Sequence, residues 1–417
     1  MTSRTLIRVQ YLTRVTAPQV DPKTFEEEDV AHYSIPSVQE NAGPIVEKAS
    51  SIDSNKLQLQ GHEVLVSRLN PHKNTVVQVK RNSLPILCST EFIPFEPTGI
   101  EPRFLCYSFQ GQNSIQHLVA YASSATRSHA RVDPSDIIKF KIPVFQREEQ
   151  FVIADYLDHE TARIDELIHQ KERMLELLAE KRAALVTQVV TRGLNSKVRL
   201  KKAELGWSDH IPEHWQVMQL KRTWLSSEYG ISDSIREEGD IRVLRMSCIT
   251  KDGRIDLANS GQVEDVPPGL FLTDGDILFN RTNSLDQIAK VGLLDVEPET
   301  PTSFASYLVR IRVNSRVSQK YLVALLNSRD FLQYARSNAI PAIGQANLSP
   351  SRYGEIRIAL PPRDEQDEIV KATEQETKRT ARLEKELIDS IDLLRERRSA
   401  VITAAVTGQL AVEEMTP

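Results

Sequence analysis

The feature that most constrains this chain is an internal duplication with a spacing of 216 residues. Arg147-Glu148-Glu149-Gln150 recurs as Arg363-Asp364-Glu365-Gln366, and the two copies then stay in register without a gap as far as Leu194 and Leu410. Seventeen of these 48 aligned positions carry the same residue. Because a fixed period marks a repeated structural unit, we expect the chain to contain each of its main parts twice.

The duplicated segments, residues 147–194 and 363–410, have the pattern of long helices. Their apolar residues recur at alternating steps of three and four, which is typical of a coiled-coil seam with polar interruptions. Proline precedes each segment and glycine ends it, as expected for helix start and stop signals. We expect the seam to contain Leu157, Ile164, Ile168, Leu175, Leu178 and Leu185 in the first copy, and Leu383, Leu387, Ile391, Leu394 and Val401 in the second.

Two such helices need a partner for their apolar stripes. A helix of about 40 residues is roughly 60 Å long, and alone it would leave its seam in water. Pairing within the chain is favoured because one chain supplies two matching seams. The alternative is that each helix pairs with a helix of another molecule.

The segments between the helices indicate mixed domains. Short β-prone runs occur at 63–67, 241–246, 276–279 and 308–313, bounded by turn residues, and a helical patch covers Gln319 to Ala335. The predicted fold class is therefore α+β, with two mixed α/β domains separated by two long helices that form an intramolecular coiled coil. The predicted parts are a first domain at 1–146, a helix at 147–194, a linker at 195–205, a second domain at 206–362, a helix at 363–410 and a tail at 411–417.

The net charge of −5 conceals an uneven distribution. Residues 1–146 carry 15 basic and 14 acidic side chains, and residues 193–362 carry 21 and 20, which gives +1 for each region. Residues 147–192 carry 7 against 10, and residues 363–417 carry 9 against 13, which gives −3 and −4. The acid excess thus lies in the helical segments, and the domains stay compatible with a nucleic-acid partner.

Several kinds of chemistry lack a sequence signature. There is no phosphate-binding loop of the Gly-x4-Gly-Lys-Ser/Thr type and no Asn- or Asp-Pro-Pro-aromatic methyltransferase motif. His210 and His214 have metal-like spacing, but Pro212 lies between them and no second ligand pair is near. We therefore expect no catalytic residue, no metal and no cofactor.

The first residues and the cysteines indicate where in the cell the protein is located. The first residues lack the apolar core and cleavage site of a secretory signal, and no membrane segment is evident. Cys88, Cys106 and Cys248 are too few and scattered for a disulfide framework. We expect a cytoplasmic protein whose cysteines serve as buried packing.

The first candidate site follows a predicted strand in each domain. Arg281 and Asn283 come directly after the run 276–279, and Arg68 and Asn70 take the equivalent place in the first domain. The side chains of Arg and Asn match base edges in the major groove. The alternative is that each Arg braces its own domain or contacts only phosphates.

The second candidate site is a polar loop directly before each long helix. It contains Gln345 and Asn347 in the second domain, and Arg127, His129 and Arg131 in the first. Loops that differ in residue type at equivalent places suit recognition of two unrelated half-sites. Drift on a solvated loop would produce the same difference.

The plan of the chain resembles the specificity subunit of type I restriction-modification systems. The resemblance covers essentially the whole chain and lies in the motifs that open the helices, in Ile211-Pro212-Glu213-His214-Trp215, in Gly275-Asp276-Ile277-Leu278 and in Val406-Thr407-Gly408-Gln409-Leu410. It implies two target-recognition domains that each recognise half of a split, asymmetric DNA site. It also implies that the coiled coil is antiparallel and sets the gap, that two modification (methyltransferase) subunits dock on the repeated regions, and that restriction or motor subunits join through the complex.

The chain departs from the family pattern at its beginning. Met1-Thr2-Ser3-Arg4 stands where the second domain has the Ile-Pro-Glu-His-Trp lead. This puts in doubt how the edge of the first domain docks onto the helices.

Two other classes of function stay open at this point. One is a non-catalytic coiled-coil scaffold with two protein-binding domains. The other is a self-sufficient nuclease or methyltransferase, which turnover by the purified chain would reveal.

Overall fold

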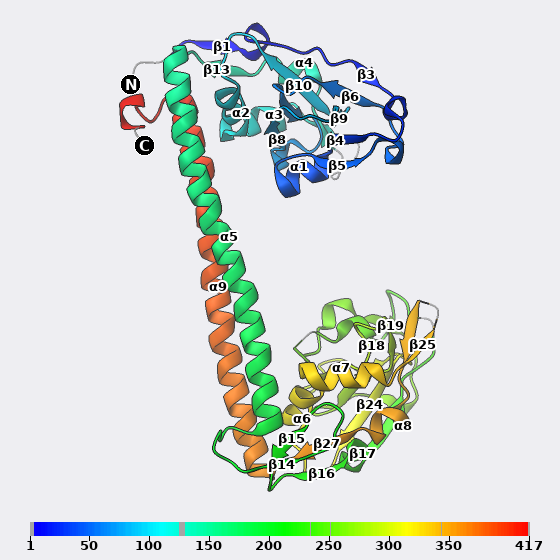
Figure 1. The fold of residues 1–417 in the computed structure, drawn as a ribbon. Coiled ribbons are helices and arrows are strands. Elements are labelled where there is room, and N and C mark those ends of the chain that lie inside the picture. Colours follow the sequence, from blue (N-terminus) through cyan, green and yellow to red (C-terminus); the bar gives the residue numbers. More distant parts are fainter. Residues whose placement is uncertain (1–3, 125–129, 234, 251, 343, 416–417) are drawn as a thin grey trace. The chain divides into compact units, whose positions relative to one another are not determined.

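The computed structural model describes residues 4–124, 130–233, 235–250, 252–342 and 344–415. The chain divides into two compact units. Unit 1 comprises residues 1–173 and 387–417, and unit 2 comprises residues 174–386. Each unit therefore contains one mixed domain and one end of each long helix (Figure 1).

The domain of unit 1 contains two sheets of four and five strands. The five-stranded sheet has the order β3-β6-β9-β4-β5, and the four-stranded sheet has the order β2-β10-β7-β8. Its helices are α1 (Ile35–Asn41), α2 (Pro102–Gln110), α3 (Gln112–Ala120) and α4 (Pro134–Ile137). Its strands are β1 (Leu6–Arg8), β2 (Thr13–Arg14), β3 (Gln19–Val20), β4 (Asp29–Tyr33), β5 (Ile45–Lys48), β6 (Lys56–Leu59), β7 (Val64–Ser67), β8 (Val76–Gln78), β9 (Ile86–Ser89), β10 (Phe92–Pro97), β11 (Ser123–Ser124), β12 (Ala130–Arg131) and β13 (Lys141–Pro143).

The domain of unit 2 repeats much of this arrangement. Its four-stranded sheet has the order β17-β24-β20-β22, and a three-stranded sheet has the order β19-β18-β23. Its helices are α6 (Gln319–Leu326), α7 (Arg329–Ser337) and α8 (Pro350–Glu355). Its strands are β14 (Leu200–Lys202), β15 (His210–Pro212), β16 (Gln216–Gln219), β17 (Trp224–Tyr229), β18 (Ile241–Leu244), β19 (Gly261–Val263), β20 (Ile277–Asn280), β21 (Thr282–Asn283), β22 (Val291–Leu293), β23 (Thr302–Phe304), β24 (Leu308–Val313), β25 (Ile340–Ala342), β26 (Gln345–Asn347) and β27 (Arg357–Leu360).

The duplication therefore extends from the helices to the strand order. In each domain the first long strand of one sheet pairs in parallel with a later strand, β4 with β9 and β18 with β23. An antiparallel pair leads into each long helix, β1 with β13 and β16 with β27. The predicted class of two mixed domains with two long helices is confirmed.

One of the shorter expectations needs adjustment and another is confirmed. The helical patch predicted from Gln319 to Ala335 is two helices, α6 and α7, because the chain turns at Asn327 and Ser328. The Ser328 hydroxyl bonds to the Leu325 carbonyl, which helps to close α6. Cys88, Cys106 and Cys248 are free and buried, as predicted.

The long helices are α5 (Arg147–Arg192) and α9 (Arg363–Thr407), of 46 and 45 residues. In unit 1, Arg395 of α9 pairs with Glu172 of α5 at 3.1 Å, and Arg398 pairs with Asp165 at 2.8 Å. As the residue number increases along α9, the residue number of the partner on α5 decreases. The two helices are therefore antiparallel there.

The seam residues of the helices differ in burial. Leu157, Ile164 and Ile391 are buried, whereas Leu383 is 39% exposed. Partly buried are Ile168, Leu175, Leu178, Leu185, Leu387, Leu394 and Val401.

The placing of Leu383 on the seam was wrong. Alternating steps of four and three, counted back from Ile391, reach Leu387, Glu384 and Thr380. Thr380 is buried and Glu384 is partly buried, so Leu383 lies one position off the buried face.

The ends of both helices are part of the domain cores. Ile153 of α5 and Ala405 and Val406 of α9 belong to the core of unit 1. Ile369 of α9 and Val190 of α5 belong to the core of unit 2. Each domain thus packs on the beginning of one helix and the end of the other.

The segment after α9 also completes a domain. Met415 is buried in the core of unit 1, and Leu410 and Val412 are packed against it. The first domain is therefore built from both ends of the described chain.

Replacing Ile369 by Ala tests whether the helix end carries the stability of the second domain. Ile369 is fully buried in that core, so the loss should lower the free energy of unfolding by about 2–5 kcal/mol. Urea unfolding measures this. Ile388→Ala on the same helix is the control, because Ile388 is 49% exposed and should change little. Equal losses in the two variants would contradict the shared core.

Candidate nucleic-acid interface

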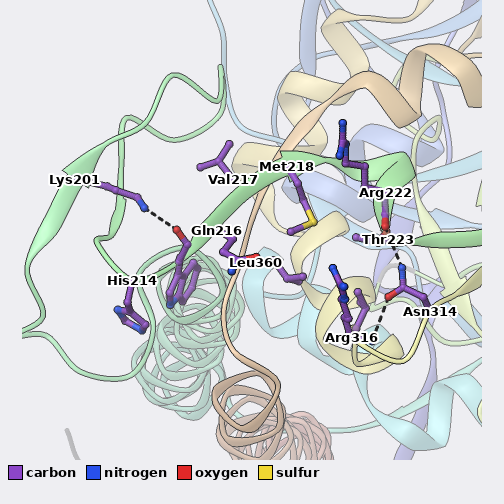
Figure 2. A pocket seen from close by; sticks show the side chains of 12 residues that line it. Lys201, His214, Gln216, Val217, Met218, Arg222, Thr223, Asn314, Arg316 and Leu360 are labelled. Carbon is purple, nitrogen blue, oxygen red and sulfur yellow. Dashed lines mark hydrogen bonds between the residues drawn. The ribbon is translucent and has the colours of Figure 1, made fainter.

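A pocket of about 780 Å³ lies beside β16 and β27 in the second domain (Figure 2). Lys201, Arg222, Arg316 and His214 line it, and none of its lining residues is Asp or Glu. The Lys201 ammonium donates to the main-chain oxygens of Glu213 and Trp215 at 2.6 and 2.7 Å. This lining lacks the carboxylates that acid–base or metal chemistry uses and contains no predicted DNA-contact residue, and those residues lie elsewhere in the domains.

The two candidate segments of the second domain come together in one small sheet. Strand β26 lies between β21 and β25, with Thr282 opposite Asn347 and Asn283 opposite Ala346. Residues that the sequence separates by more than sixty positions are therefore neighbours. Ile343, in the predicted polar loop, lies outside the described residues.

Arg281 is held at the edge of this sheet. Its guanidinium donates to the Ser306 carbonyl and to Oδ1 of Asn347, both at 3.4 Å, and lies 5.1 Å from the ring centre of Tyr229. The Nε atom is buried without a hydrogen-bond partner. Arg281 is thus oriented by weak contacts and keeps spare donor capacity.

The neighbouring amides of the sheet are differently placed. Asn347 donates to the Thr282 hydroxyl at 3.1 Å, and Oδ1 of Asn283 accepts from the Ser284 main chain at 2.8 Å. Gln345 is exposed. These side chains give the sheet edge both donors and acceptors.

The first domain has the same backbone frame. The Asn70 main-chain N–H donates to the Ala130 carbonyl at 2.7 Å, and Leu69 forms a bridge with Arg131. Val132 donates to the carbonyl of Arg68 at 2.9 Å, as Leu348 does to the carbonyl of Arg281 at 2.8 Å. Arg127 and His129 lie outside the described residues.

The side chains on this shared frame differ between the domains. Arg68 and Arg131 both pair with Glu91, at 3.4 and 2.9 Å. Arg131 stands 216 positions before Asn347, so a cation replaces an amide at the equivalent place. Hydrogen bonding to Glu91 raises the pKa of the Arg131 guanidinium. The first domain thus presents two arginines that share one carboxylate.

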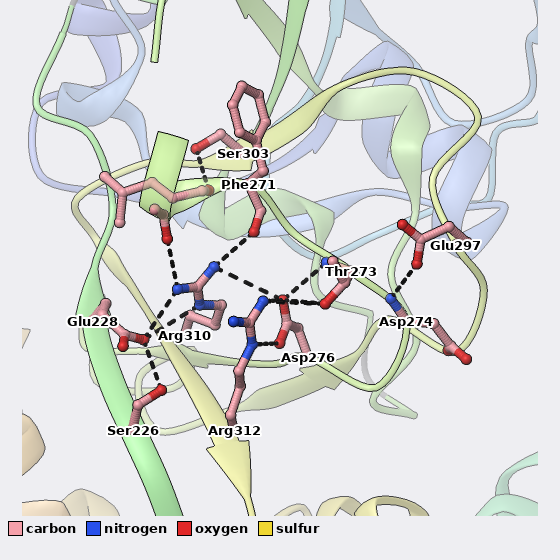
Figure 3. Close-up of polar contacts among 12 residues, drawn as sticks. Ser226, Glu228, Phe271, Thr273, Asp274, Asp276, Glu297, Ser303, Arg310 and Arg312 are labelled. Atoms are coloured by element: carbon pink, nitrogen blue, oxygen red, sulfur yellow. Dashed lines mark hydrogen bonds and ion pairs between the residues drawn. The ribbon is translucent and has the colours of Figure 1, made fainter. Parts of the chain in front are cut away.

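A polar cluster supports strand β20, which ends one residue before Arg281 (Figure 3). Asp276 precedes β20 and pairs with Arg312 at 2.6 Å, and its Oδ2 accepts from the Thr273 main chain at 2.9 Å. Arg310 donates to the carbonyls of Phe271 and Gly269 at 2.7 and 2.8 Å. The cluster therefore ties the loop before β20 to β24.

The first domain uses a different acid for the same purpose. Glu63 precedes β7, and its carboxylate accepts from the main-chain N–H groups of Gln60, Gly61 and His62 at 2.7 to 3.0 Å. Glu63 before β7 and Asp276 before β20 thus each close the turn that leads into their strand. Its role is to support the strand rather than to contact a ligand.

The helix-opening motif makes equivalent contacts in both units. Gln150 accepts a hydrogen bond from the main-chain N–H of Glu101, and Gln366 accepts one from Ser318, each at 2.8 Å. We did not predict a role for these glutamines from the sequence. Their exact recurrence in the duplication was the signal that could have identified them.

Among the described ranges, no group of three or more His, Cys, Asp or Glu side chains is arranged to hold a metal ion. Nε2 of His214 instead contacts Glu365 at 2.7 Å. Over the same described residues, no helix has both the length and the apolar character needed to cross a membrane.

Comparison with known proteins gives matches over nearly the whole chain. The chain is 20% identical over 414 residues to the type I restriction enzyme StySPI specificity subunit of Salmonella potsdam, covering 94% of this chain and 86% of that one. It is 23% identical over 369 residues to the EcoKI specificity subunit of Escherichia coli K12, covering 85% and 76%.

Solved structures show the same fold. A chain from a structure of the type I R-M system superposes with a TM-score of 0.74 at 15% identity, covering 98% of this chain and 99% of that one. The HsdS subunit from Thermoanaerobacter tengcongensis superposes with a TM-score of 0.52 at 16% identity, covering 98% of both. Residues 212–393 match the family model described as the type I restriction modification DNA specificity domain. The resemblance predicted from the sequence is therefore confirmed: the chain is similar to type I restriction enzyme specificity subunits.

Proposed function

We propose that the chain is the non-catalytic, sequence-specific DNA-binding subunit of a type I restriction-modification complex. Each domain would recognise one half of a bipartite, asymmetric site. The observation that carries the proposal is the duplicated frame at 68–70 with 130–132 and 281–283 with 346–348, which presents different side chains in the two domains. The residues that we propose for DNA contact are Arg68, Asn70, Arg127, His129, Arg131, Arg281, Asn283, Gln345 and Asn347.

The helices would set the gap between the two half-sites. At 1.5 Å per residue, α5 and α9 are each roughly 70 Å long. Their acid excess suits a spacer that contacts protein rather than DNA. Domain limits at 1–146 and 206–362, with the helical segments 147–194 and 363–410, fit this division of labour.

Two modification subunits would dock on the helices. Leu167 and Leu383 are equivalent in the duplication, as are Leu177 and Leu393, and all four are 37% to 64% exposed. Unit 1 contains Leu167 and Leu393, and unit 2 contains Leu383 and Leu177. A surface that occurs once per unit with the same residues suits two copies of one partner.

The remaining chemistry would belong to the partners. Adenine methylation and its methyl donor would come with the modification subunits, and DNA translocation and cleavage with the restriction subunits, in the cytoplasm. A scaffold whose domains bind protein is the second candidate. DNA retention that weakens with salt distinguishes the first candidate from it.

The direct test is to express the chain with its modification subunits in bacteria and map the methylated adenines of the genome. Two fixed motifs separated by a constant gap are expected. Unmethylated DNA in the presence of a stable complex would count against the proposal.

Replacing Arg281 or Arg68 by Ala should weaken DNA binding. Losing a base contact reduces the free energy of binding by about 1–3 kcal/mol. Losing a phosphate contact instead reduces the slope of log binding constant against log salt concentration by about 0.9. Titrations of the complex with target DNA at several salt concentrations separate the two cases. Arg254→Ala is the control, because Arg254 is exposed and pairs only locally with Asp252. Unchanged affinity in both Arg281→Ala and Arg68→Ala would remove these residues from the site.

Replacing Leu177 or Leu393 by Asp should remove one modification subunit from the complex, and the double variant should remove both. A charge placed in an apolar contact opposes burial. Mass measurement of the purified complex gives the stoichiometry. Leu225→Asp is the control, because Leu225 is 73% exposed but lies in the second domain. Full occupancy in the double variant would contradict docking at these leucines.

A further inference from the structure

We propose that the Glu-Gln pair at the start of each long helix positions the recognition domain on that helix, and that the two joints differ in kind. The first joint, at Glu149-Gln150, is ionic, and the second, at Glu365-Gln366, is aromatic. The inference rests on the proposed function, because its consequence is how strictly the chain distinguishes one gap length from another.

The glutamine of each pair links three segments of one unit. Gln150 accepts from the main chain of Glu101 at 2.8 Å and donates to the carbonyl of Phe145 at 2.9 Å. Gln366 accepts from Ser318 at 2.8 Å and donates to the carbonyl of Pro361 at 2.9 Å. Each side chain therefore joins the long helix both to the segment that follows the preceding strand and to the start of a domain helix.

The residues that these glutamines hold are themselves structural. Glu101 caps α2 by accepting from the main chain of Phe104, and Ser318 caps α6 by accepting from Tyr321. Both glutamines are buried, Gln366 completely. Because a buried donor or acceptor left unpaired is costly, the amide favours one placement of the domain over neighbouring ones.

The glutamate of each pair meets a different partner in the two units. Glu149 pairs with Arg4 at 3.0 and 3.2 Å, and the Arg4 guanidinium lies 4.0 Å from the ring centre of Phe145. Glu365 accepts from the indole N–H of Trp215 at 3.1 Å and also contacts Nε2 of the exposed His214 at 2.7 Å. Arg4 therefore takes the place of Trp215 as the N–H donor to the glutamate.

These partners give the joints different sensitivity to salt. The Arg4 side chain is 35% exposed, and exposed ion pairs are screened by salt. Trp215 is 1% exposed and belongs to the core of unit 2. Because the buried Trp215 also holds Glu365, salt should loosen the first joint more than the second, in which the exposed His214 contact is only one part.

A looser joint would weaken the preference for one gap length but would leave the affinity for a half-site unchanged. The proposed DNA contacts of the first domain lie on the frame at 68–70 and 130–132, which is formed without Glu149 or Gln150. Affinity for a single half-site should then persist. Discrimination between the native gap and a gap one base pair longer or shorter should fall, because that discrimination depends on a fixed domain position.

The experiment uses the chain copurified with its modification subunits and duplexes that carry the mapped site. The duplexes have the native gap, a gap changed by one base pair, or a single half-site. Gln150→Leu should lower the ratio of altered-gap to native-gap Kd by roughly tenfold, the factor expected for one buried group left unpaired. Half-site Kd should stay within about twofold, since the frame is intact.

Three further variants complete the design. Gln366→Leu should lower the same ratio less, because Trp215 still anchors its joint. Gln150→Glu keeps an acceptor for Glu101 and should partly restore the ratio. Gln170→Leu is the matched control on α5, because Gln170 is exposed and bonds only to Glu166.

A salt series tests the difference between the joints. In the unaltered chain the ratio of altered-gap to native-gap Kd should fall as the salt concentration rises. In Arg4→Met the same ratio should be low at every salt concentration. Both duplexes contact the same phosphates, so the general weakening of DNA binding by salt cancels in the ratio.

The outcomes separate this inference from the proposed function. If the unaltered complex shows no preference between gaps, the proposed function fails. If it does show one and both Gln150→Leu and Arg4→Met retain it, the joint is not what positions the domain. Loss of half-site affinity together with gap preference in Gln150→Leu and Gln150→Glu would mean a purely structural role and would also overturn the inference.

Discussion

The burial of helix ends inside the domain cores is the interaction on which the rest of the molecule depends. Ile153 and Ile369 stand at equivalent places near the start of α5 and α9, and each is fully buried among residues of its own domain. A long helix with a partly polar seam gains little from pairing alone. Its ends are also buried in the domain cores. The domains in turn obtain a rigid base, and the glutamine contacts give that base a defined orientation.

The separation of charge follows the same division. The helical segments carry the acid excess, at −3 and −4, while each domain region is near neutral. Positive groups on the proposed interface are few, and in the first domain Arg68 and Arg131 share Glu91. Binding would therefore depend on placing a few contacts correctly rather than on a broad basic surface. Such an interface needs a fixed scaffold.

Much of the fold was predictable because the two long helices form a gapless sequence repeat with heptad spacing of apolar residues. The interface was predictable only in pieces. Arg281 and Asn347 were both selected for their chemistry, but their contact depends on the pairing of β21 with β26, which no local pattern encodes. Leu383 was misplaced by one residue because apolar character competes with strict seam spacing. The equivalence of Arg4 and Trp215 could not be predicted from the sequence, because the two side chains have only an N–H donor in common.

The participation of Met415 in the first core has a consequence for synthesis of the chain. Unit 2 is one continuous segment, whereas unit 1 needs residues from both ends. As the polypeptide leaves the ribosome, the second domain can therefore close first, and the amino-terminal domain must wait until the last helix has emerged. This reverses the usual order in which domains fold during translation. In the interval the newly made first domain exposes the apolar surface that α9 later covers, so chaperones have a longer opportunity to act on it than on the second domain.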